Sequence, residues 1–163
     1  MEIEAPAHFG HAGHLGPKIA SKDPRTANFS ETFVDIDLRE CEFIQPPAVL
    51  WCLVYGLLAA RTNSTCRLLV PQNLGVAIYL KSVELFRILQ ESRIDVDDRG
   101  VAGRPPGRLI LPITQFTTES EVDKISNEAS ERLTAAGVGA ANLYSVVAEV
   151  FAELAMNAVT LAV

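Results

Sequence analysis

Three polar side chains near the end of the chain, Glu149, Glu153 and Asn157, recur every four residues in a stretch that is otherwise apolar. Residues four apart lie one turn from each other on the same face of an α-helix. A carboxylate one turn from a carboxamide can position a water molecule or a hydrated divalent cation. The spacing therefore makes Glu149, Glu153 and Asn157 candidates for positioning a water molecule or a hydrated divalent cation.

The element that carries these side chains is predicted to be a helix over residues 143–163. This stretch contains neither Gly nor Pro, and its apolar residues recur at helical spacing. The apolar stripe consists of Leu143, Val147, Val150, Leu154, Ala158 and Leu161. A packed amphipathic helix without any chemistry is the competing interpretation of the same pattern.

The segment Glu153–Ala158 resembles the N-box of the histidine-kinase-like ATPases. In that superfamily the Asn binds the Mg²⁺ that bridges the ATP phosphates, and the Glu is the general base. The resemblance implies Mg-ATP as the cofactor of a completed domain. The Gly-rich boxes and the lid that complete the nucleotide pocket do not occur before Val163. We therefore expect no complete catalytic site, no cofactor and no enzymatic activity in this chain.

The composition limits the class of protein. A chain of 163 residues with 48% hydrophobic residues fits one domain with an appendage. A net charge of −6 disfavours nonspecific nucleic-acid binding, which depends on Lys and Arg contacts to phosphates. The acidic start lacks the apolar region of a secretory signal. The cysteines at 41, 52 and 66 match no zinc or redox spacing, which favours reduced thiols in a cytoplasmic protein.

No residue from Phe43 to Ala60 is charged, which raises the question of a membrane span. Pro46 and Pro47 near its start leave roughly 13–15 helical residues, fewer than the ~20 that a spanning helix needs. We therefore predict a fully buried helix of an α/β core.

Residues 1–30 are polar, interrupted by Pro and Gly, and without periodicity, so they are predicted to be a flexible arm. Within this arm His8, His11 and His14 have a spacing that would suit a transition metal if the segment were ordered. A disordered tail is the preferred interpretation.

The middle of the chain alternates strands and helices. Phe33–Leu38 alternates apolar and charged residues, which predicts a half-buried strand with Asp35 and Asp37 as solvated edge charges. A helix over 47–61 follows, in which Gly56 would allow close packing. A strand over 66–70 and a helix over 74–90 come next. This order with short connections indicates an α/β fold with a mostly parallel sheet and packed helices.

A loop is predicted for residues 91–108, which are charged and then rich in Gly and Pro. Three acidic residues of this loop lack the spacing of a calcium loop, so a metal site is disfavoured. They are Asp95, Asp97 and Asp98. Three basic residues would suit an acidic partner, although a solvated loop is the default. They are Arg99, Arg104 and Arg108.

After the loop we expect one strand and two helices. Leu109–Phe116 is predicted to be a strand, with Pro112 suited to an edge or a bulge. Thr118–Glu121 has the spacing of a capping box, which begins a helix that Gly137 ends. The helix over 143–163 closes the chain.

The segment Phe33–Leu89 resembles the STAS-like domains of anti-sigma-factor antagonists. The resemblance lies in the strand Phe33–Leu38, the phrase Phe43–Leu50 and the strand–helix unit 66–90. In that family the loop before the first helix carries a phosphorylated Ser or Thr. Here Gln45-Pro46 stands in its place, so no phosphorylation switch is expected. By analogy the partner surface is the start of the first helix, Gln45, Pro46, Pro47 and Ala48.

Residues 109–162 resemble the opening of an anti-sigma-factor-type ATPase domain. The resemblances together divide the chain into a flexible arm (1–30), a STAS-like domain (31–92), a loop (93–108) and the start of an ATPase-like domain (109–163), truncated after the N-box helix. They imply a bacterial regulatory protein-interaction module of the anti-sigma-factor/antagonist type. Its partner would be a kinase-like or sigma-regulatory protein, or a second copy bound through the C-terminal helix.

Two alternatives remain open at this point. The first is the N-terminal part of an ATP-dependent serine kinase or ATPase, with Glu153 as base and Asn157 as ligand of the magnesium ion. The second is a STAS-like domain that binds a small ligand or a lipid, which only the apolar helix over 47–61 favours. A Mg-ATP site is the feature that separates the first alternative from an interaction module.

Overall fold

The computed structural model describes residues 2–5, 7–9, 33–62, 65–98, 100–102, 112–114 and 116–137. The chain divides into two compact units, Met1–Arg104 and Pro105–Val163. The boundary between them falls inside the segment 93–108.

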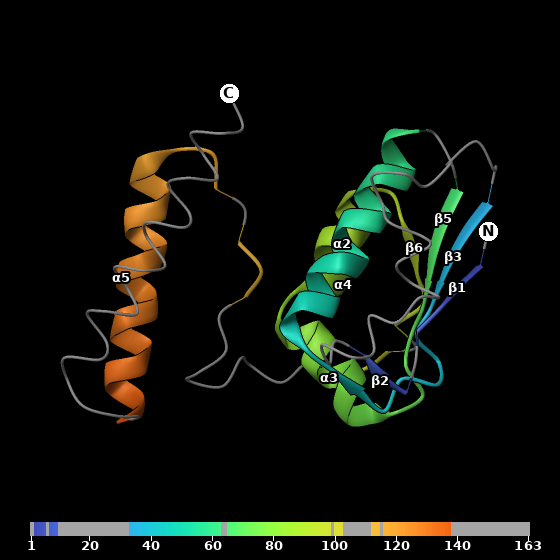
Figure 1. The fold of residues 1–163 in the computed structure, drawn as a ribbon, viewed down its shortest axis with the longest axis horizontal. Helices are drawn as coiled ribbons and strands as arrows, with labels where there is room; N and C mark the ends of the chain where they lie inside the picture. The colour runs from blue at the N-terminus through green and yellow to red at the C-terminus, as the bar shows by residue number, and fades with distance from the viewer. Residues whose placement is uncertain are drawn as a thin grey trace. The chain divides into compact units, whose positions relative to one another are not determined.

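The first unit is built around a parallel sheet of four strands in the order β1-β3-β5-β6 (Figure 1). These strands are β1 (Glu2–Glu4), β3 (Phe33–Asp37), β5 (Thr65–Leu69) and β6 (Asp95–Val96). A second parallel sheet pairs β2 (His8–Phe9) with β4 (Phe43–Ile44). The helices of this unit are α2 (Pro46–Arg61), α3 (Leu74–Ser82) and α4 (Leu85–Glu91). The predicted α/β class with a parallel sheet and packed helices is confirmed.

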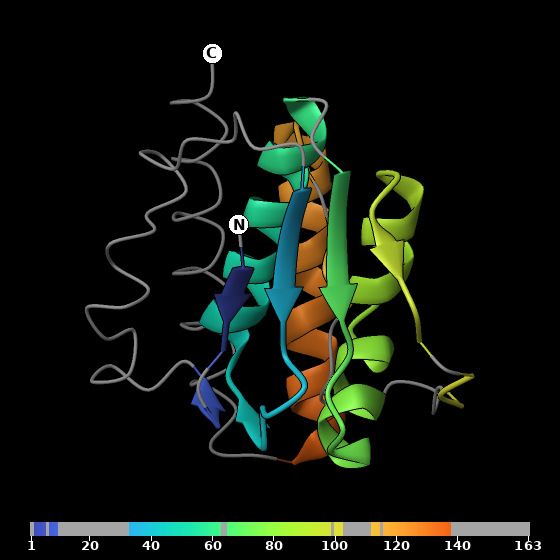
Figure 2. The same ribbon diagram turned by 90° about the vertical axis from the view of Figure 1, so that its right-hand side faces the viewer.

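The helices of the first unit lie on one face of the four-stranded sheet, and the core fills the space between the two layers (Figures 1 and 2). The strands alternate, so that Val34 and Ile36 of β3 and Cys66 and Leu68 of β5 are buried. The helices bury a matching set: Ala48, Val49, Cys52, Tyr55, Ala59, Val76, Ala77, Leu80, Leu85, Phe86 and Leu89. Among the described residues of this unit, none lies over the opposite face of the sheet (Figure 2).

Gly56 lets α2 approach α4 closely, as predicted. A Cβ atom at this position would lie 2.8 Å from Ile94 Cδ1 and 2.9 Å from Leu89 Cδ2, shorter than real Cβ contacts. The two helices therefore share a seam that only the smallest side chain permits.

The N-terminal arm predicted for residues 1–30 is corrected at its start. β1 pairs with β3 in parallel, and β2 pairs with β4. Backbone hydrogen bonds extend both pairings. Ala5 N donates to the backbone carbonyl oxygen of Asp37 at 2.8 Å, and Gln45 N donates to that of Phe9 at 2.9 Å. Strands of two or three residues carry too few side chains to show a period. Their pairing was therefore not visible in the sequence.

Two further predictions about this unit were wrong. Asp35 and Asp37 lie on β3, which is an inner strand flanked by β1 and β5 rather than an edge. The helix predicted over 74–90 is broken at Val83–Glu84, where Glu84 adopts a left-handed conformation with φ of 65°. The apolar spacing continues through the break because both helices bury residues against the same core.

The structure also differs from the prediction in the segment of the predicted loop and in the strand expected after it. Asp95 and Val96, expected in a loop, form the edge strand β6 beside Arg67 and Leu68. Within the predicted strand Leu109–Phe116, the described residues Pro112–Thr114 and Phe116 are not in a strand. Proline has no N–H to donate to a ladder, which favours irregular backbone here.

The second unit contains α5 (Glu119–Ala136), which begins and ends as predicted. Thr118 Oγ1 accepts a hydrogen bond from Glu121 N at 3.4 Å, and Thr118 N donates to the Glu121 carboxylate at 3.0 Å. Backbone N–H donation from Thr117 and Thr118, with the Thr118 hydroxyl, holds the pKa of Glu121 below its usual value. Gly137, with φ of 66°, ends the helix.

Candidate functional site

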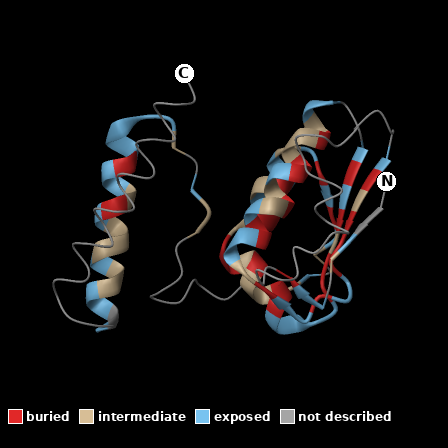
Figure 3. Ribbon diagram, in the orientation of Figure 1, coloured by how far each residue is buried: buried red, intermediate tan, exposed pale blue. Residues whose placement is uncertain are grey.

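The outer face of α2 is apolar and exposed. Seen along the helix, Pro46, Pro47, Leu50 and Val54 fall on the side opposite the core, with Leu53 and Leu57 half-buried beside them. Leu50 is 52% exposed and Val54 is 44% exposed. In Figure 3 the buried residues of α2 follow the side that faces the sheet. The prediction of a fully buried helix was therefore wrong, because one face of α2 lies outside the core.

The residues of the predicted partner surface, at the start of α2, differ in their exposure. Gln45 is the N-cap residue, with extended backbone and no side-chain capping bond. Pro46 and Pro47 occupy the first helical turn, where their missing N–H groups cost nothing, and both are exposed. Ala48 is fully buried against the core. The predicted surface is thus corrected: Ala48 cannot contact a partner, whereas the two prolines can.

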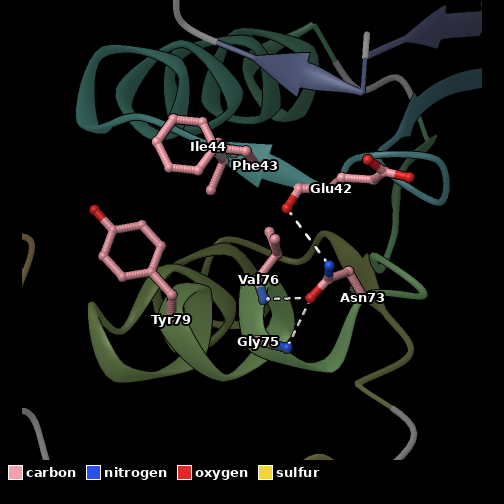
Figure 4. Close-up of a pocket in the computed structure, with 7 residues that line it drawn as sticks. All are labelled: Glu42, Phe43, Ile44, Asn73, Gly75, Val76 and Tyr79. Carbon is pink, nitrogen blue, oxygen red and sulfur yellow. Dashed lines mark hydrogen bonds between the residues drawn. The ribbon is translucent and has the colours of Figure 1, made fainter.

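A cavity of about 370 Å³ lies between β4 and α3 (Figure 4). It is lined by Glu42, Phe43, Ile44, Asn73, Gly75, Val76 and Tyr79. Phe43 is 46% exposed and lies two residues before Gln45, the N-cap of α2. The cavity and the outer face of α2 are therefore joined through a continuous stretch of chain.

Asn73 shapes one wall of this cavity and is itself satisfied. Its Oδ1 accepts hydrogen bonds from Gly75 N at 2.9 Å and Val76 N at 3.3 Å, which caps α3, and its Nδ2 donates to the Glu42 carbonyl at 3.5 Å. Burial raises the pKa of the Tyr79 phenol, so this hydroxyl is protonated at neutral pH. Figure 4 shows the Glu42 carboxylate pointing away from the Phe43 and Tyr79 rings. The arrangement suits an apolar group and contains no acid–base pair.

The open face of the sheet is charged instead. Arg67 on β5 makes two hydrogen bonds to Asp35 on β3, the shorter one 2.7 Å. Arg39 makes a similar pair with Asp37 at 2.6 Å, and these hydrogen bonds hold the pKa of the Asp37 carboxyl below its usual value. A second cavity of about 290 Å³ lies at the carboxyl end of β5 and β6, lined by Arg67, Leu68, Leu69, Val70, Asp95 and Asp97.

The candidate metal ligands are not gathered where the structure describes them. His8 is exposed on β2, and Asp98 is paired with Lys81 Nζ at 3.0 Å. Within the described ranges no group of three or more His, Cys, Asp or Glu side chains is placed to hold a metal ion.

The three cysteines are free thiols, as predicted, and all three are buried. Burial raises the pKa of the Cys52 thiol and that of Cys41, and it raises the pKa of Cys66 to about 11. Protonated thiols in the core are poor nucleophiles. They are packing residues here.

Several predicted site residues lie outside the described residues. They are Glu149, Glu153, Asn157, His11, His14, Arg99, Arg104 and Arg108. The N-box expectation therefore stays a prediction.

The sequence did not single out Phe43, Leu50, Val54 or Tyr79. Leu50 and Val54 belong to a helix that is apolar on every side, so hydropathy could not distinguish its free face from its buried face. Their spacing of four residues was the one usable signal, since both lie on the same face as Pro46 and Pro47.

Two further observations bear on function. Across the described parts of the chain, no helix has the length and apolar character needed to cross a membrane. Compared with protein-family models, curated proteins and solved structures, the chain gives no match in any of the three.

Proposed function

We propose that this chain is a protein-interaction module of the anti-sigma-factor antagonist type, a binding protein without chemistry of its own. Its partner surface is the outer face of α2 (Pro46, Pro47, Leu50 and Val54) together with Phe43. The observation that carries the proposal is the exposure of Leu50 and Val54 on a helix whose one charged residue is Arg61.

Exposed apolar residues are common singly, but a contiguous apolar patch is typical of an interaction site. Burial of such a surface stabilises a complex by roughly 25 cal/mol for each Å² removed from water. The cavity beside Phe43 adds a place for an apolar side chain of the partner, since buried anchors contribute most to affinity.

The resemblance of Phe33–Leu89 to STAS-like domains supports the same surface, because that family binds its partners around the first helix and the loop before it. Gln45 and Pro46 carry no hydroxyl at the position that is phosphorylated in the family. We therefore expect binding that does not depend on phosphorylation of this loop.

The proposal is tested by affinity capture from a bacterial lysate that also contains the untagged wild-type chain, with quantitative mass spectrometry. The immobilised baits are the wild-type chain, Leu50→Asp, Val54→Asp and the control Leu74→Asp. Leu74 lies on α3 and its side chain is 62% exposed, so the control makes the same chemical change away from α2. We expect a protein that wild type and Leu74→Asp retain and that both α2 variants lose by at least about tenfold. Identical captures by all four baits would contradict the proposal.

Small-ligand binding is the second candidate, and the cavity between β4 and α3 is the observation that favours it. A volume of about 370 Å³ lies within the range of small-molecule sites, and its lining is mostly apolar. The amphiphilic dye anilinonaphthalene sulfonate serves as the probe. We expect saturable fluorescence enhancement that Tyr79→Ala weakens and Leu74→Ala does not. Equal enhancement with both variants would exclude this cavity as the binding site.

A further inference from the structure

We infer that the partner of the outer face of α2 is a second copy of this chain, bound as an antiparallel pair of α2 helices. This inference rests on the proposed function and names its partner. It follows from the register of exposed residues on α2 and from the charges at the two ends of that helix.

The exposed apolar residues of α2 form a pattern that complements itself. A two-fold axis passing beside residue 52 places Leu50 of one copy opposite Val54 of the other, and Pro47 opposite Leu57. With a rise of 1.5 Å per residue, each member of the first pair lies about 3 Å from the axis along the helix. Such a contact is isologous, because both copies use the same residues, and it closes at two subunits.

The charges at the ends of α2 agree with this register. Arg61 is exposed in the last turn, and Glu42 is exposed just before β4, ahead of the first turn. Among the described residues, no ion pair includes Arg61 or Glu42. The antiparallel arrangement brings Arg61 of each copy toward Glu42 of the other.

The overall charge favours self-association through the outer face of α2 rather than through the open face of the sheet. The chain carries a net charge of −6, so two copies repel each other at long range. The open sheet face exposes the carboxylates of Glu4 and Asp95, where that repulsion would be stronger than at an uncharged helix face. Between Pro46 and Ala60, α2 has no charged residue. Two copies therefore approach each other at the least cost through α2.

One helix pair buries less than the roughly 1,600 Å² of a standard interface, so we expect a dimer that dissociates at micromolar concentrations. Sedimentation equilibrium of the full chain, from about 5 µM to about 500 µM, measures this directly. Leu50→Asp is expected to raise the dissociation constant at least about tenfold, whereas the matched control Leu74→Asp leaves it unchanged.

A charge exchange tests the register itself. Arg61→Glu and Glu42→Arg are each expected to weaken the dimer several-fold, because each places like charges together. The double variant restores the attraction between copies and returns the dissociation constant to near the wild-type value. Lys124→Glu, an exposed charge reversal on α5, serves as the control for net charge. Circular dichroism of every variant verifies that the fold is retained.

Three results would overturn the inference: a chain that stays monomeric throughout, a dimer that survives Leu50→Asp, or a double variant no tighter than the single ones. A monomer whose lysate capture is still lost with Leu50→Asp would refute the second copy and leave the proposed function standing. A monomer whose capture is unaffected by Leu50→Asp would refute both.

Discussion

Two surfaces of the first unit lie away from its core, and they are built in opposite ways. The open face of the sheet carries carboxylates and guanidinium groups that pair with each other, as in Asp35 with Arg67 and Asp37 with Arg39. The outer face of α2 carries Leu50 and Val54, and these side chains have nothing polar beside them on the helix. The charged sheet face is stable when it is hydrated. Burial of the apolar α2 face away from water lowers the free energy.

This difference shows why the α2 face is the better candidate site. Exposed ion pairs contribute little to the free energy of binding, because the cost of removing them from water offsets much of their attraction. An exposed apolar stripe lowers the free energy of the chain only when something covers it. The following variants test whether the two faces and the core differ as described, in order of decreasing expected effect. Fluorescence of the one tryptophan, Trp51 on α2, reports unfolding of the first unit because its ring packs 4.1 Å from that of Tyr55, between ring centroids.

Leu68→Ala and Leu50→Ala make the same truncation in the core and on the outer face of α2. Leu68 is fully buried on β5, so its truncation is expected to lower the free energy of unfolding by about 3 kcal/mol. Leu50→Ala is expected to change that free energy by less than about 0.5 kcal/mol, because Leu50 is 52% exposed on the outer face of α2. Urea titrations measure both. A large loss with Leu50→Ala would mean that α2 has no free face.

Asp37→Asn removes the better buried of the two sheet-face ion pairs. The pKa of Asp37 is lower in the folded chain, so its contribution is complete above the unfolded value of about 3.9 and is lost as the pH falls through the folded value. We expect the variant to be less stable by about 1 kcal/mol at pH 7, with the difference shrinking below pH 4.

Urea titrations at several pH values measure this difference. Asp95→Asn, which changes an exposed carboxylate on β6, two strands from β3, serves as the control. A difference between wild type and Asp37→Asn that did not change with pH would show that the carboxylate charge is not the cause.

Gln45→Ser tests the beginning of α2. Gln45 has the extended backbone of an N-cap but makes no capping bond, whereas Ser can accept one from an N–H of the first turn. We expect a gain of about 0.5 kcal/mol in the free energy of unfolding, with dimerisation unchanged because the apolar face is untouched. Gln45→Ala is the matched control without a hydroxyl. A gain of equal size with Ala would rule out capping as the reason.

Arg67→Gln breaks the exposed ion pair with Asp35 and is expected to have the smallest effect of the four. Exposed pairs contribute little because water screens them. The shift in the urea midpoint should be smaller than that of Asp37→Asn and should vanish in 1 M salt. A larger shift than that of Asp37→Asn would reverse the order of the two pairs.

Sequence patterns determined the elements that depend on local chemistry. The alternation in Phe33–Leu38 predicted β3, the prolines and the apolar run predicted α2, and the capping box with Gly137 predicted both ends of α5. These features succeeded because propensity, capping and backbone restrictions act between residues close in the chain. The order of strands and helices was also sufficient for the α/β class and the parallel sheet.

Tertiary structure decided the features that depend on residues far apart. β1 and β6 are strands only because β3 and β5 offer them partners, and Glu84 breaks a periodic helix because packing on the core favours the turn. The free face of α2 follows the same rule. Its residues are apolar on all sides, so the sequence determined that α2 forms, and the position of the sheet and α4 determined which side stays exposed.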